Sequence, residues 1–130
     1  MFANTQANGI DVAIIDASTQ QTDPATPVVA SRNMAFGCMG VGVAHAVFLA
    51  GMPAHTLATV VPCSVVDHGS VQGAEYGGLR GSSRHLTGAS SVLVGGVSAT
   101  RVSSITLQNG HHSQGARVMP SQLKVLILAR

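Results

Sequence analysis

A phrase that occurs twice constrains the fold of this chain more than any other feature of its sequence. Residues Val47–Leu57, VFLAGMPAHTL, align without gaps with Val92–Val102, VLVGGVSATRV, at a spacing of 45 residues. In both copies an apolar triplet is followed by small, turn-forming residues and then by a second run of apolar and polar residues. Self-similarity at such a period indicates an architecture built from one repeated supersecondary element.

A third copy of the pattern lies at the end of the chain. RHLTGASSVLV, which begins at Arg84, aligns without gaps with RVMPSQLKVLI, which begins at Arg117, at a spacing of 33 residues. The first copy begins at Arg32 and carries a seven-residue insertion before Val47. The sequence therefore predicts three units, each an arginine-led segment that leads into a short strand.

Each complete unit is predicted to be a β-hairpin. In the second unit Val92–Val94 forms the first strand and Gly95 and Gly96 form the turn, because branched apolar residues favour strands and glycine accepts positive φ. Gly51 and Gly96 are expected at equivalent corners with positive φ. Pro53 fits a turn or a strand start, where no N–H is needed for the strand ladder.

The third unit stops at the point where its turn should begin. Its strand KVLIL lacks the partner that the other two units possess, and an unpaired apolar strand is an edge prone to aggregation. We expect the N-terminal stretch to complete this hairpin, with Val12, Ile14 and Ile15 paired beside Val125–Leu128. The predicted fold class is all-β: a small three-faced cone or pyramid of three pseudo-repeated hairpin units around an approximate three-fold axis.

The composition indicates a single domain, residues 1–130, with an unusual surface. Only 9% of the residues are charged and 45% are apolar, whereas ordinary globular domains carry about 25% charged residues. A surface so poor in charge is covered by a partner or built from backbone and small side chains. The net charge of +2, spread over scattered basic residues, argues against a nucleic-acid partner.

The N-terminal stretch and one charge-free internal segment are considered as membrane-directed segments, and neither is expected to be one. The N-terminal stretch has no basic region of the kind that opens a secretory signal. Residues 34–54 carry no formal charge and are long enough to span a bilayer, but their glycines, histidine and proline favour a buried segment of small residues instead. Cys38 and Cys63 are consistent with an intracellular chain; they either pair or lie reduced and buried, and the second is preferred.

No catalytic motif frames the titratable residues. The sequence contains no G-x-S-x-G elbow, no C-x-x-C pair, no H-E-x-x-H helix and no Walker A loop. We therefore expect that the chain is not an enzyme. The alternative from the residues alone is a small hydrolase in which His85, His111 or His112 acts as general base.

Two phrases carry a resemblance to a known family. GMPAH at residues 51–55 and GGVSATR at residues 95–101 resemble the proline-alanine-alanine-arginine (PAAR) phrase of the proteins that tip the bacterial type VI secretion spike. The chain also resembles the PAAR-like family in its opening, MFANTQANGIDVA, and in its close, QNGHHSQGARVMPSQLKVLILA. The residues matched to the phrase are Gly51, Pro53, Ala54, His55, Gly95, Gly96, Ala99, Thr100 and Arg101.

The resemblance implies a structural role. A PAAR-like cone caps the blunt end of a trimeric valine-glycine-repeat (VgrG) spike, one copy per trimer, and sharpens it for puncture, so contact with a membrane is transient. The chain is expected to carry no appended toxin domain and to take an effector, and a tip-loading chaperone, as separate chains. It is expected in the bacterial cytoplasm before firing, and outside the cell or in the target cell afterwards.

The resemblance also implies zinc, held near the tip of family members by three histidines and one cysteine. Ser18 stands where relatives carry the cysteine, and no histidine lies near Arg32. His111 or His112 lies where a family ligand would, so these are the candidate metal ligands. A tip or adhesin-like β-module of another contractile or phage-tail-like assembly is the structural alternative to the type VI spike.

Overall fold

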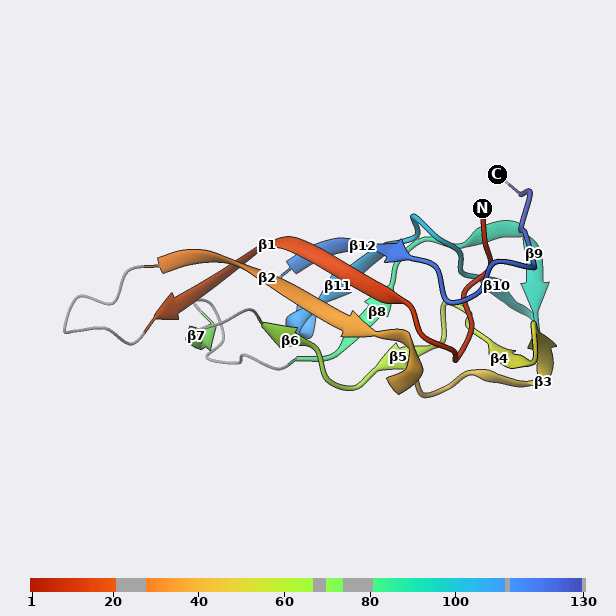
Figure 1. Cartoon of the computed structure of the whole chain (residues 1–130), viewed down its shortest axis with the longest axis horizontal. Coiled ribbons are helices and arrows are strands. Elements are labelled where there is room, and N and C mark those ends of the chain that lie inside the picture. Colours follow the sequence, from red (N-terminus) through yellow and green to blue (C-terminus); the bar gives the residue numbers. More distant parts are fainter. Residues whose placement is uncertain (21–27, 67–69, 74–80, 112, 130) are drawn as a thin grey trace.

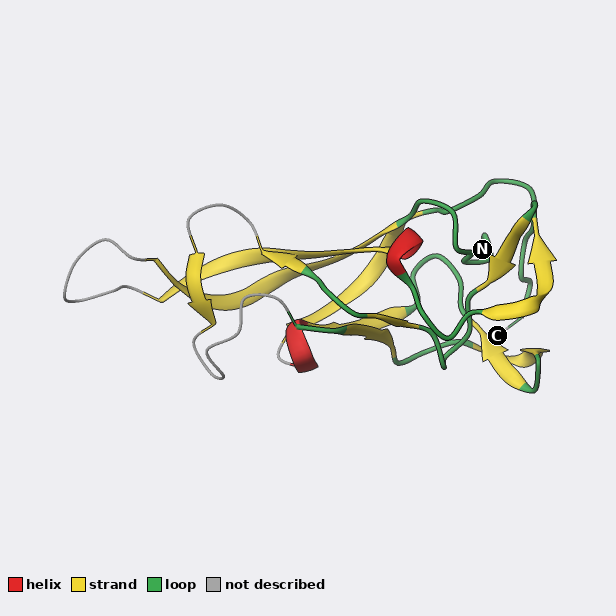
Figure 2. Ribbon diagram, turned by 90° about the horizontal axis from the view of Figure 1, so that it is seen from below, coloured by secondary structure: helices red, strands yellow, loops and turns green. Residues whose placement is uncertain are grey.

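The computed structural model describes residues 1–20, 28–66, 70–73, 81–111 and 113–129, and this part of the chain is mostly β-structure. The molecule is elongated, with short hairpins gathered at one end and long strands running away from them (Figures 1 and 2). We call these two parts the hairpin end and the shaft. The expected all-β fold class is confirmed.

Both parts are built from short sequence stretches. The strands of the hairpin end are β3 (Ala44–Leu49), β4 (Met52–Ala54), β9 (Ala89–Val94) and β10 (Val97–Ala99). The strands of the shaft are β1 (Ile10–Gln20), β2 (Val28–Phe36), β5 (Val60–Val61), β6 (Val65–Val66), β7 (Ser70–Gly73), β8 (Ser83–His85), β11 (Ile105–Gln108) and β12 (Ser113–Met119). Two short 3-10 turns, η1 (Gly37–Met39) and η2 (Asn109–His111), follow β2 and β11.

The two predicted hairpins form as expected. Strands β3 and β4 are joined at Ala50 and Gly51, whose φ angles are 54° and 84°. Strands β9 and β10 are joined at Gly95 and Gly96, whose φ angles are 60° and 82°. Two consecutive residues with positive φ are the mark of the type I′ turn, whose twist matches that of the strands it joins. The prediction of positive φ at Gly51 and Gly96 is confirmed.

The third hairpin is made from the two ends of the chain. Phe2 lies opposite Leu126 in an antiparallel bridge. The N–H of Ile127 donates to the carbonyl oxygen of Met1 at 2.8 Å, and the Met1 ammonium donates to the Ile127 carbonyl oxygen at 3.0 Å. The N-terminus therefore completes the third unit, as the truncated repeat predicted.

The prediction of which N-terminal residues complete the third hairpin was wrong. Val12, Ile14 and Ile15 belong to β1, which pairs with β12 and β2 in the shaft. The prediction relied on the apolar character of these residues, but the first residues of the chain already lie against the strand at 125–127. Strand β1 begins only at Ile10, after the chain has left the hairpin end.

The apolar core lies inside the hairpin end and receives residues from all three hairpins. Its buried members are Ala3, Ala54, Ala89, Val94, Ala99 and Ile127. Half-buried residues of the outer strands, among them Val47, Val92 and Val125, pack against it. Because the buried members are mostly alanines, the three hairpins can approach one another closely around their common axis.

The strands of the shaft close on themselves. Strands β5, β8, β11, β12, β1 and β2 are hydrogen-bonded neighbours in this order. Val41, which follows β2 and η1, exchanges two hydrogen bonds with Val60 of β5, with N···O distances of 2.8 and 2.9 Å. This bridge joins the two ends of the row, so these strands form a closed ring. Strands β6 and β7 extend the β1–β2 hairpin beyond it.

The arginine-led segments are only partly equivalent. Arg84 and Arg32 are exposed on the outside of the shaft, whereas Arg117 is buried, with 1% of its surface exposed. The pairing of β1 with β12 shifts by one residue at Val118. Ile10 lies opposite Met119, whereas the next residue of β1, Asp11, lies opposite Arg117. Arg117 lies on the same inner face of β12 as Ser113 and Gly115, opposite the buried Asp11, and the β-bulge follows it at the exposed Val118. The arginines that align in the repeat therefore differ in environment, since Arg32 and Arg84 are exposed and Arg117 is buried.

The charge-free segment at residues 34–54 runs through the end of β2, η1 and the β3–β4 hairpin. No helix in the described part of the chain is long and apolar enough to cross a membrane. The prediction that this segment is buried is wrong in part, since Phe48 and Cys38 are exposed. Cys38 and Cys63 are both free thiols, and Cys63 is half-buried.

Candidate functional site: the three-fold hairpin end

Three short stretches meet where the inner strands of the hairpins end. They are Ala3–Thr5, Ala54–Thr56 and Ala99–Arg101, and each begins with a fully buried alanine. The last two belong to the phrase found by sequence. The sequence analysis did not identify the first stretch, Ala3–Thr5, although its Ala-Asn-Thr parallels the Ala-His-Thr of the second.

The middle residues of these stretches form a closed cycle of backbone hydrogen bonds. The N–H of Asn4 donates to the carbonyl oxygen of Thr100 at 2.9 Å, the N–H of Thr100 donates to that of His55 at 3.2 Å, and the N–H of His55 donates to that of Asn4 at 3.0 Å. Each residue donates once and accepts once within the cycle. Such a cycle requires an approximate three-fold axis that passes between the three residues.

Two further sets of three contacts are related by the same approximate three-fold axis. The flanking residues form antiparallel bridges, which are Ala3–Arg101, Thr5–Ala54 and Thr56–Ala99. Outside them lie N–H donations to carbonyl oxygens, from Gln6 to Pro53 at 2.9 Å, from Leu57 to Ser98 at 3.0 Å and from Val102 to Phe2 at 2.9 Å. A single chain thus presents three equivalent backbone faces at this end.

The structure brings the residues of the phrase into this region in different roles. His55 and Thr100 lie around the axis as members of the cycle, while Pro53 supplies a carbonyl acceptor. The guanidinium of Arg101 donates to the carbonyl oxygen of Ala129 and so holds the last described residue of the chain. Ala54 and Ala99 are buried in the core, and the three glycines occupy the turns described above.

His55 is held in one orientation. Its Nε2 lies 3.0 Å from Oε1 of Gln6, and because an amide oxygen only accepts, Nε2 carries the proton. The amide of Gln6 in turn donates to the carbonyl oxygens of Cys38 at 2.8 Å and Gly40 at 2.9 Å. Burial, followed by the nearby charge of Arg117 and the neighbouring His85, lowers the pKa of His55 to about 3. The imidazole is therefore neutral at physiological pH.

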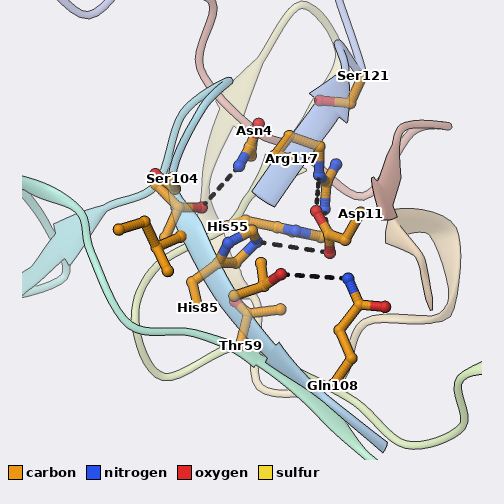
Figure 3. Close-up of polar contacts among 12 residues, drawn as sticks. Asn4, Asp11, His55, Thr59, His85, Ser104, Gln108, Arg117 and Ser121 are labelled. Atoms are coloured by element: carbon orange, nitrogen blue, oxygen red, sulfur yellow. Dashed lines mark hydrogen bonds and ion pairs between the residues drawn. The ribbon is translucent and has the colours of Figure 1, made fainter. Parts of the chain in front are cut away.

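A buried ion pair lies inside the shaft, near His55 (Figure 3). Arg117 donates through Nε to Oδ1 of Asp11 and through Nη2 to Oδ2 at 3.3 Å. His85 Nε2 lies 4.0 Å from the same carboxylate. Burial raises the pKa of Asp11, while the charge and hydrogen bonds of Arg117 act in the opposite direction. Burial and the charge of Arg117 lower the pKa of His85 to about 3.

The large buried side chains are polar, whereas buried apolar residues of the ring, such as Ala13, Ala35 and Val61, are small. The largest fully buried side chains are Arg117, His55, Gln108, Asn4, Asn33, Thr5, Thr100, Thr106, Asp11 and Ser64. Large apolar side chains, in contrast, are exposed on the outside of the molecule, among them Ile14, Val65 and Val118. In a ring this narrow, hydrogen-bonded polar side chains fill the space that a larger domain would fill with apolar ones.

A comparison with known protein families matches residues 9–115 to the toxin PAAR-like domain. The chain belongs to the PAAR-like family. No curated protein and no solved structure gives a significant match. The matched range stops short of both ends of the chain, so the third hairpin of this PAAR-like protein, built from residues 1–3 and 125–127, lies outside it.

The PAAR-like domain is a structural, toxin-associated module and not a known enzyme family. Of the histidines considered as general bases, His85 is buried in the ring beside Asp11. The side chain of His111 and the whole of His112 lie outside the described residues.

Zinc is implied by the resemblance, and the described residues do not fit it. They contain no group of three or more histidine, cysteine, aspartate or glutamate side chains that could hold a metal ion. The two buried imidazoles, of His55 and His85, lie near the guanidinium of Arg117, whose positive charge lowers their pKa values and opposes a cation in the same way.

Proposed function

We propose that this PAAR-like protein is the tip of a type VI secretion spike and caps a trimeric VgrG-type protein with its hairpin end. The observation that carries the proposal is the cycle of hydrogen bonds among Asn4, His55 and Thr100. This cycle makes one chain three-fold symmetric in its backbone. The match of residues 9–115 to the PAAR-like family supports the same role.

Matching symmetry explains why one copy suffices. A homotrimer ends in three identical surfaces related by a three-fold axis, and a monomer with three equivalent faces can engage all of them at once. Contacts of this kind close after one copy, because no face remains to bind another subunit. The shaft then points away from the spike, along its axis.

The proposed sequence of events during secretion follows from this geometry. The tip is loaded onto the spike in the bacterial cytoplasm and leaves the cell with it, and the shaft leads as the spike punctures a membrane. An effector is carried as a separate chain bound to the tip, and a chaperone assists loading. The closed ring of the shaft, with few unpaired strand edges, is suited to a part that bears load.

Native mass spectrometry of the complex tests the stoichiometry. We expect one copy of this chain per trimer when it is mixed with the VgrG trimer encoded nearest to its gene. Two or three copies per trimer would contradict the symmetry argument. Binding to the trimeric tip of another contractile assembly, with none to VgrG trimers, would favour the alternative of a phage-tail-like tip.

A further inference from the structure

The outer strands of the three hairpins share one pattern of burial. In residues 44–49, 89–94 and 122–127 the second, third and fifth positions are exposed, and the first, fourth and sixth are buried or half-buried. The spacings between these segments, 45 and 33 residues, are those of the sequence repeat. The three segments are therefore equivalent residue by residue, including the one formed by the end of the chain.

At one exposed position all three units carry a bulky apolar residue. The fifth residues are Phe48, Leu93 and Leu126, and their exposed fractions are 62%, 60% and 53%. We call these residues the apolar triad. Their cross-strand neighbours are also equivalent, since they lie opposite Pro53, Ser98 and Phe2.

The other exposed positions of the same strands show no such agreement. The second position is histidine, serine or leucine, and the third is alanine, serine or lysine. The triad positions thus keep apolar bulk in a place where the fold itself does not require it. The residues on either side of each triad member, such as Val92 and Val94 beside Leu93, are the ones that face the core.

The position of these strands matters as well. In Figure 1, β3 and β9 lie at the extreme end of the molecule, outside β4 and β10, and the last residues of the chain run beside β9. The triad is therefore carried by the outermost strand of each hairpin. Exposed apolar side chains that gather on one part of a surface indicate an interaction site.

We infer that Phe48, Leu93 and Leu126 are the anchors that bind the tip to its partner, each filling an apolar pocket on one of three identical subunits. This inference rests on the proposed function and names the side chains that carry it. The partner must present three equal apolar pockets around its axis. Because the subunits are identical, each pocket must accept either phenylalanine or leucine. Since Lys124 is the only charged residue in these outer strands, the affinity should depend weakly on salt.

The test measures the affinity for the same VgrG trimer by biolayer interferometry. We expect Phe48→Ser, Leu93→Ser and Leu126→Ser each to weaken binding roughly 30-fold, the size of effect typical of an interface hot spot. The triple variant should show no measurable binding. Phe48→Leu should bind within about threefold of the natural chain, because it leaves a leucine in each of the three pockets.

Matched controls separate the triad from its surroundings. Ala46→Ser and Ser91→Ala change the exposed positions two residues before the triad and should leave affinity unchanged. Far-UV circular dichroism and hydrogen exchange at the Thr100 amide confirm that each variant keeps the three-fold backbone cycle. We expect every variant to fold, since the triad side chains are largely exposed.

The outcomes distinguish the inference from the proposed function. If the natural chain binds no VgrG trimer, the proposed function fails and the inference fails with it. If the natural chain binds and the folded triple variant binds equally well, the anchors are elsewhere while the proposed function stands. If the triple substitution abolishes only self-association of the free chain, the triad pairs copies of this protein and the inference is wrong.

Discussion

At the scale of single residues, the large side chains inside the ring of the shaft are held by charges and hydrogen bonds more than by apolar contacts. The Asp11–Arg117 pair joins β1 to β12 inside the ring, and Gly37 leaves room for it, since a Cβ there would lie 2.8 Å from Nη1 of Arg117. Removing one partner of a buried ion pair typically costs about 3–5 kcal/mol, because the other charge stays buried without compensation. His55 and His85 lie beside this pair and stay neutral.

These histidines make stability depend on pH. Their pKa values are lowered to about 3 in the folded protein, against 6.5 in the unfolded chain, so the unfolded state takes up protons first as the pH falls. Stability from this source is complete above pH 6.5 and is lost as the pH falls towards 3. Each histidine contributes a loss of about 1 kcal/mol in unfolding free energy per pH unit within that window.

Chemical denaturation at several pH values measures this effect. The His55→Gln/His85→Gln double variant should lose clearly less stability than the natural chain between pH 6.5 and 4.5. Asp11, whose pKa is raised by burial, acts in the opposite direction, but it is present in both proteins, so the difference between them reports the histidines. Equal slopes for the two proteins would show that the histidines are not buried as the structure places them.

At the scale of elements, the type I′ turns hold the hairpins in register. Gly96 has φ of 82° with no atom within 4 Å of the place where a Cβ would lie, so a larger residue meets conformational strain and no clash. A β-branched residue held at positive φ typically costs about 1–3 kcal/mol.

We therefore expect Gly96→Val to lower the melting temperature by several degrees. Ser98→Ala, in the strand that follows, should have little effect, because Ser98 takes part in the three-fold contacts through its carbonyl oxygen. Differential scanning calorimetry of both variants measures the difference. A negligible effect of both substitutions would contradict the role of the turn.

At the scale of the whole molecule, the three-fold end is closed by non-covalent contact between the two ends of the chain. Besides the pairing of Met1 with Ile127, Gln122 Nε2 donates to the carbonyl oxygen of Ala3 at 2.9 Å. Deletion of residues 1–6 removes one of the three faces and leaves the strand at 125–127 without its partner.

We expect this deletion variant to be insoluble or to self-associate, as seen by light scattering. In the intact protein the amides of Asn4 and Ile127 should exchange with deuterium as slowly as that of Thr100. A circular permutant, with residues 130 and 1 joined by a short glycine linker and new ends between Gly95 and Gly96, should fold, because it only moves the break to an equivalent turn. Fast exchange at Asn4 in the intact protein would show that the third face is not formed.

The sequence by itself determined the hairpins. Turn residues and alternating apolar positions act over a few neighbouring residues, so the β3–β4 and β9–β10 hairpins, their corners at Gly51 and Gly96 and the truncated third unit could all be read from the order of residues. The three-unit repeat also predicted that the N-terminus returns to complete the fold.

Only the tertiary structure decided how the three units meet. It places Phe2, and not Val12, against the end of the chain, and it buries Arg117 opposite Asp11 while Arg84 faces out. It also brings Asn4, His55 and Thr100 into one hydrogen-bonded cycle, although they are far apart in sequence. These choices depend on strand register, since a shift of one residue reverses the face of every side chain that follows. Register between distant segments is set by the packing of the whole molecule.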